Sequence, residues 1–189
     1  SCATLAKEML DEILGWFPGR EFTLVADGAY ACKEMLGGSP PSVRFVGRMR
    51  GDAALYDPKV PRQKKGKRGR KPRKGPRLPN PRDAARKADR KRTEAGCWLW
   101  QAVEVTIYGG QRTLLAVSYV AVWPRVLGLA PIQIVVVRDP EGRMDDVYLF
   151  TTDQSASLGW VIEQFSWRWS IEVLFRASKQ VMQIEAPQN

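Results

Sequence analysis

The feature that most restricts the fold of this chain is a strongly basic segment between residues 62 and 92. The segment contains 16 Lys or Arg residues and only two Asp residues, and it is rich in Pro and Gly. Such a composition cannot bury enough apolar surface to offset the entropy of folding, so we expect a disordered loop. The loop is either a solvated insertion or an arm that holds phosphate groups.

The composition of the whole chain suits one globular domain: it has 189 residues, of which 44% are hydrophobic. Histidine is absent and Cys2, Cys32 and Cys97 are widely spaced, which excludes the usual Cys/His zinc sites and favours free thiols. The sequence has no signal peptide and no apolar run of ~20 residues, so we expect a cytoplasmic protein without a membrane segment. The chain begins without Met inside an apparent helix and ends just after another, so both ends look truncated.

The order of the predicted elements indicates an α/β fold. Apolar residues at helical spacing predict a helix over Ala3–Trp16, and Phe22–Ala26 reads as a buried strand that ends at Asp27. Residues 42–50 alternate as a second strand, and residues 97–151 read as a series of antiparallel strands with turns at Gly109-Gly110 and around residues 139–142. A long helix follows over residues 157–184.

The last helix carries the strongest chemical signal. At 100° per residue, five side chains fall within an arc of about 80°: Phe165, Arg168, Glu172, Arg176 and Lys179. The opposite face is apolar, so we expect it to be buried; it contains Trp160, Trp167, Ile171, Leu174 and Val181. The polar face is either a set of ordinary i,i+4 ion pairs, worth roughly 0.2–0.5 kcal/mol each, or a metal-binding carboxylate flanked by phosphate-binding cations.

Two motifs resemble those of DDE transposases of bacterial insertion sequences. The spacing Phe165-x2-Arg168-x3-Glu172-x6-Lys179 resembles the family's Tyr-x2-Arg-x3-Glu-x6-Lys signature, and ADGAYA resembles the block that carries the second catalytic aspartate, here Asp27. The sequence departs from the signature at Phe165, because phenylalanine lacks the hydroxyl of tyrosine. No residue matches the family's first aspartate, which lies upstream of the block that this chain contains.

The resemblance implies a ribonuclease-H-like fold, in which a mixed sheet is flanked by helices and interrupted by a β-rich insertion. Residues 1–50 and 151–189 would belong to the catalytic core, and residues 51–150 to the insertion with its disordered loop 62–92. Asp27 and Glu172 would bind two Mg²⁺ ions, for which Mn²⁺ can substitute. The implied activity is DNA strand cleavage and strand transfer in cut-and-paste transposition by a homodimer, and a chain without the first aspartate is expected to be inactive on its own.

The resemblance also implies contacts with the DNA backbone from Arg168, Lys179 and Arg176. Further phosphate contacts are expected from the basic loop, at Lys64, Lys65, Lys67, Arg68, Arg70 and Lys71. Trp98, Trp100 and Trp123 are candidates for stacking on a flipped base, with core packing as the alternative use. Asp153 is a conceivable substitute for the missing carboxylate. The competing interpretations are a non-catalytic DNA-binding protein that acts through residues 62–92 and a decayed transposase relic.

Overall fold

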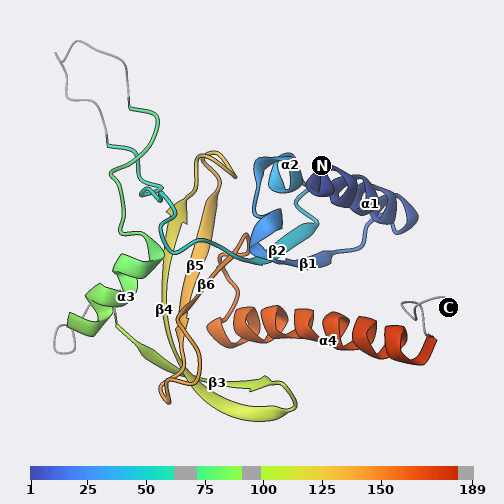
Figure 1. The fold of residues 1–189 in the computed structure, drawn as a ribbon. Coiled ribbons are helices and arrows are strands. Elements are labelled where there is room, and N and C mark those ends of the chain that lie inside the picture. Colours follow the sequence, from blue (N-terminus) through green and yellow to red (C-terminus); the bar gives the residue numbers. More distant parts are fainter. Residues whose placement is uncertain (62–71, 91–98, 183–189) are drawn as a thin grey trace.

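The computed structural model describes residues 1–61, 72–90 and 99–182, which form a six-stranded sheet with helices on both faces (Figure 1). In chain order the elements are α1 (Cys2–Trp16), β1 (Phe22–Ala26), the short 3-10 helix η1 (Gly28–Tyr30), α2 (Lys33–Leu36), β2 (Val43–Arg48), α3 (Pro81–Arg90), β3 (Gln101–Ile107), β4 (Gly110–Val122), β5 (Pro131–Arg138), β6 (Val147–Thr151) and α4 (Leu158–Met182). The mixed α/β fold agrees with the prediction, and the bounds of β1 match those expected. The expectation that β1 is buried was wrong, because β1 is an edge strand and none of its five residues is fully buried.

The strand order is β1-β2-β6-β5-β4-β3, so β1 lies at one edge of the sheet. β1 and β2 are parallel, whereas every other neighbouring pair is antiparallel. The strands from β3 to β6 therefore continue the sheet that β1 and β2 begin. One end of this sheet brings together the C-terminal ends of β1 and β2 and the turn between β5 and β6. We call this the Asp27 end.

The β3–β4 hairpin turns at Tyr108 and Gly109, which have φ angles of 53° and 78°. Two successive residues with positive φ make the tight turn whose twist suits a two-residue hairpin. The predicted turn was one residue too late, since Gly110 already pairs with Ile107 in the ladder.

Each face of the sheet has its own apolar core. On one face α1, α2 and α3 cover a cluster that includes Phe45, Ile134 and Phe150. On the other face, α4 contributes Val161 and Ile162 to a second cluster. This arrangement places α3 and α4 on opposite sides of the sheet.

Helix α3 corrects the expectation that residues 62–92 form a loop throughout. Three small side chains on one side of the helix are almost fully buried against the sheet: Ala84, Ala85 and Ala88. Asn80 caps the helix, because its Oδ1 accepts a hydrogen bond of 2.8 Å from the backbone N–H of Asp83. Pro81 occupies the first helical position, where its missing N–H costs nothing. Residues 62–71 and 91–92 of the basic segment lie outside the described residues.

Helix α4 corrects a second expectation, because much of its predicted buried face is exposed. Trp167, Ile171 and Leu174 are 54–63% exposed, while Phe165, expected on the polar arc, packs into the core. The helix crosses the sheet from β3 towards β1 (Figure 1). Its 25 residues extend about 37 Å, whereas six strands at ~4.8 Å spacing span about 24 Å. The C-terminal part of α4 therefore projects past β1. No helix within the described ranges has the length and hydropathy to cross a bilayer.

Candidate active site

Asp27 lies immediately after β1, at the point where the strand leaves the sheet. Its backbone is extended, and its Oδ1 accepts a 2.7 Å hydrogen bond from the N–H of Gly28, which caps the short helix η1. The side chain is exposed. A strand end is a stiff position for a functional carboxylate, because the paired strand fixes the backbone while the side chain remains accessible.

A pocket of about 600 Å³ connects Asp27 with helix α4. It lies at the free edge of β1, between α1 and α4, which flank this strand in Figure 1. Most of its lining is apolar, including Met9 and Ile13 of α1 and Ile171 of α4, and its charged members are Asp27 and Arg168. The structure thus brings together two elements whose motifs are about 140 residues apart in the sequence.

The helical register places position 172 on the face of α4 that borders this pocket. Arg168, Ile171 and Phe175 all line the pocket, and position 172 lies four residues after the first and three before the last. Residues three or four apart are neighbours on an α-helix, so the backbone of Glu172 lies beside Arg168 and Phe175, at the border of this face and about 100° from Ile171. The side chains of Glu172 and Arg176 lie outside the described part of the structure.

Arg168 is half-buried, and its guanidinium carbon lies 5.4 Å from the centre of the Phe165 ring. A cation over an aromatic face is held electrostatically, and more strongly where water is excluded. Phe165 thus serves as a support for Arg168, although it cannot offer the hydroxyl of the family signature. Lys179 lies exposed near the C-terminal end of α4.

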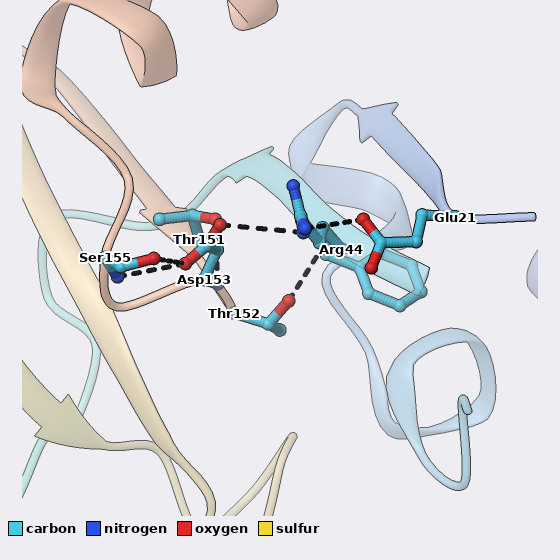
Figure 2. Close-up of polar contacts among 7 residues, drawn as sticks. Glu21, Arg44, Thr151, Thr152, Asp153 and Ser155 are labelled. Carbon is cyan, nitrogen blue, oxygen red and sulfur yellow. Dashed lines mark hydrogen bonds and ion pairs between the residues drawn. The ribbon is translucent and has the colours of Figure 1, made fainter. Parts of the chain in front are cut away.

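Asp153 does not join Asp27. Because β6 runs antiparallel to β2 and β1 parallel to it, Asp153 follows β6 at the sheet end opposite to Asp27, about 16 Å away along the five-residue strand β1. Figure 2 shows Asp153 beside Arg44, which also contacts Glu21. Hydrogen bonds from Ser155 hold the pKa of Asp153 below its usual value. This carboxylate stabilises a loop and does not complete the site.

Two further aspartates, Asp52 and Asp146, are also engaged in ion pairs. Asp52 forms an ion pair with Arg50, whose hydrogen bond lowers the pKa of the Asp52 carboxyl. Asp146 pairs with Arg138 at 2.7 Å. Among the described residues, no three Asp, Glu or Cys side chains lie close enough together to hold a metal ion. The site therefore has one described carboxylate, Asp27, and one candidate on the adjoining helix.

The two described tryptophans among those proposed for base stacking, Trp100 and Trp123, are engaged in contacts within the fold. Trp123 is 8% exposed and meets the Phe150 ring edge-on, with 5.6 Å between the ring centres. Trp100 donates its indole N–H to Asp89, and the guanidinium of Arg138 lies over its ring at 4.4 Å. Trp98 lies outside the described residues.

The structure adds pocket residues that no sequence motif indicated. Tyr30 stands three residues after Asp27 within the ADGAYA block, and it lines the pocket together with Met9 and Ile13 of α1. The i,i+4 spacing of Met9 and Ile13 showed that both lie on one apolar face of α1. This spacing predicts a buried face and does not indicate that the face borders a pocket. The six basic residues proposed between positions 64 and 71 lie outside the described residues.

Comparison with known proteins adds one match. No curated protein and no solved structure matches this chain. The family described as DDE superfamily endonuclease matches residues 2–112. The matched region is more than half of the chain and runs from α1 through Asp27 to the start of β4, although it ends before α4. On this match, the protein belongs to the DDE superfamily endonucleases.

Proposed function

We propose that this chain forms part of a transposase catalytic domain that cleaves and transfers DNA strands in cut-and-paste transposition of an insertion sequence. Residues 1–50 and 151–189 would correspond to parts of a ribonuclease-H-like core, with residues 51–150 as its β-rich insertion, and α4 would be the helix with the Tyr-Arg-Glu-Lys signature. One observation carries the proposal: Asp27 and the α4 face that includes position 172 border the same pocket. The family match supports the action on DNA.

In this proposal, Asp27 and Glu172 hold divalent metal ions. Carboxylate oxygens are the ligands that Mg²⁺ prefers, and Asp27 is exposed at a fixed strand end, as such a ligand must be. Two bound Mg²⁺ ions, or Mn²⁺ in their place, would activate the attacking oxygen and stabilise the leaving oxygen. Arg168, Arg176 and Lys179 would position the phosphate backbone without reading the base sequence.

The proposed site needs a third carboxylate. We propose that a further strand supplies it by pairing with the free edge of β1. Two features support this: β1 is the edge strand in the described structure, and apolar side chains of both flanking helices are exposed beside it, among them Met9 and Ile171. Residues 1–189 alone would then not cleave DNA. We further propose that the complete enzyme acts in the cytoplasm as a homodimer that joins two element ends.

Removal of metal ions tests this proposal in a protein that also carries the third carboxylate. With Mg²⁺ it is expected to nick a DNA fragment that contains an element end, and excess EDTA is expected to abolish nicking while DNA binding persists. Binding without nicking in Mg²⁺ or Mn²⁺ would favour the non-catalytic DNA-binding protein or the decayed relic. Nicking that continues in EDTA would contradict the metal-dependent mechanism.

A further inference from the structure

We infer that the outer face of α3 binds the phosphate backbone of DNA and extends the DNA path from Asp27 towards β5 and β4. The inference deepens the proposed function, on which it rests, by assigning a binding surface outside the α4 signature and outside residues 62–71. It depends on the charge, rigidity and position of α3.

The charge is arranged in a row along the helix. Arg82, Arg86 and Arg90 are exposed and follow each other at intervals of four residues, so they share one side of α3 and lie about 6 Å apart along its axis. Duplex DNA carries about one negative charge per 1.7 Å of its axis. A row of three cations over about 12 Å therefore faces several phosphates at once when DNA lies along the helix.

Further cations lie beside the row. A groove next to α3 is lined by Arg77, Lys87 and Asp83, together with Arg86 and Arg90 of the row. The carboxylate of Asp83 lies 3.4 Å from Arg86, so it offsets only part of the positive charge. Asp89 is engaged elsewhere, since it accepts hydrogen bonds from Trp100 and Arg138.

The row is held rigidly. The buried alanines of α3 pack the opposite side of the helix against β4 and β5, and the Asn80 cap fixes its first turn. Cations on a packed helix lose little conformational entropy on binding, because their backbone is already ordered. This separates the α3 row from a solvated charge run, which would have to be ordered by the ligand.

The position of α3 connects the row to the candidate active site. The N–H of Arg82 donates a 3.1 Å hydrogen bond to the carbonyl of Gly51, in the turn that follows β2. Arg50 precedes this turn and is 84% exposed. Arg48, also exposed, ends β2 and follows the register pair Ala26–Gly47. It therefore lies beside Asp27 across the parallel ladder. Exposed arginines thus continue from the Asp27 end to α3.

Binding of a fluorescent DNA duplex to residues 1–189 tests the inference, with anisotropy measured over a series of salt concentrations. EDTA is present throughout, so the result does not depend on whether the proposed cleavage chemistry is correct. The variant Arg82→Gln/Arg86→Gln/Arg90→Gln keeps good helix formers at exposed positions. It is expected to bind about tenfold or more weakly at 0.1 M salt, and the slope of log affinity against log salt is expected to fall by about 2–3.

The matched control removes three positive charges at the other end of the sheet, in Arg20→Gln/Lys33→Gln/Arg125→Gln. It is expected to bind within about threefold of the unchanged protein and to keep its salt slope. A third variant with lysine at positions 82, 86 and 90 is expected to retain binding, because lysine also contacts phosphates as a point charge. Its retained binding, with unchanged circular dichroism of both α3 variants, rules out misfolding as the cause.

Three outcomes would overturn the inference. The first is an equal loss of affinity in the α3 glutamine variant and in the control, which would show an effect of net charge alone. The second is an absence of DNA binding by the unchanged protein. The third is displacement of the DNA from α3 by polyglutamate at equal charge concentration, which would point to an acidic protein partner. None of these outcomes decides whether Asp27 and Glu172 form a catalytic site.

Discussion

Replacing Glu172 with Gln is expected to lower metal-dependent DNA cleavage by about 10³-fold or more, measured in a protein that carries the third carboxylate. Glutamine keeps the size of the side chain but removes the negative charge that a metal ligand needs. A metal ion supplies several kcal/mol of transition-state stabilisation, and each ~1.4 kcal/mol corresponds to a tenfold change in rate. DNA affinity, measured by anisotropy without metal, is expected to change by less than about threefold, because Gln removes a negative charge and leaves the cations in place.

Glu104→Gln is the matched control for this prediction. Glu104 is an exposed residue of β3, on the strand farthest from Asp27 in the sheet, and its substitution changes the charge by the same amount. Cleavage by this variant is expected to remain within about twofold. Equal cleavage activity of the Glu172→Gln protein and the unchanged protein would contradict the metal-binding role. It would favour the alternative that Glu172 only forms i,i+4 ion pairs on the surface of α4.

Replacing Phe150 with Ala is expected to lower the free energy of unfolding by about 3–5 kcal/mol. Phe150 is 1% exposed, lies in central strand β6 and packs edge-on against Trp123. It also lies close to Gly47 of β2, where an added Cβ would be only 2.9 Å from the Phe150 ring. The truncation therefore leaves a cavity on this face of the sheet, beside Trp123 and Gly47, and the hydrogen-bonded β2–β6 ladder prevents the backbone from closing it. Urea unfolding followed by tryptophan fluorescence measures the change.

Phe150→Leu is the control for this prediction, because leucine fills most of the same volume; its cost is expected to stay near 1.5 kcal/mol. A loss below about 1 kcal/mol in the alanine variant would contradict the packing described for this face of the sheet. Because Phe150 lies in the core shared by α1, α3 and the sheet, the alanine variant also tests whether these elements unfold as one unit.

Local sequence patterns predicted the elements whose own residues carry a clear signal. Strand β1 is a five-residue apolar run that ends at Asp27-Gly28, so both its type and its bounds were readable. Helix α3 was missed because the charge of its neighbours dominated the composition. Its own signals were present in Asn80, Pro81 and the spacing of its alanines. The many basic residues of this segment obscured a short helix that buries only a narrow apolar stripe of alanines.

The burial of α4 could not be predicted from its periodicity. The helical periodicity correctly showed which face of α4 is apolar. Whether that face is buried depends on the length of the helix relative to the width of the sheet. Ile171 lies where α4 reaches the sheet edge and is more than half exposed, whereas Val161 lies over the sheet and is fully buried. That difference arises from tertiary structure alone.

For the candidate site, the sequence identified the candidate residues, and the structure showed which elements lie next to one another. The ADGAYA block selected Asp27 and the α4 signature selected Glu172, and the resemblance implied that the two carboxylates bind metal ions together. The pocket shared by β1 and α4 was visible only in the structure. The alternative ligand Asp153 could be set aside only when the strand directions were known, because the antiparallel β6 places it at the opposite end of the sheet.

The central claim is that the carboxylates of Asp27 and Glu172 bind the same pair of divalent ions, and anomalous diffraction from crystals soaked in Mn²⁺ tests it most directly. We predict anomalous peaks at the pocket beside β1, with oxygens of both carboxylates within about 2.0–2.5 Å of a Mn²⁺ ion and with any two peaks separated by about 3.5–4 Å. A structure with the Glu172 carboxylate directed away from this pocket, and with no Mn²⁺ beside Asp27 at saturating concentration, would contradict the account.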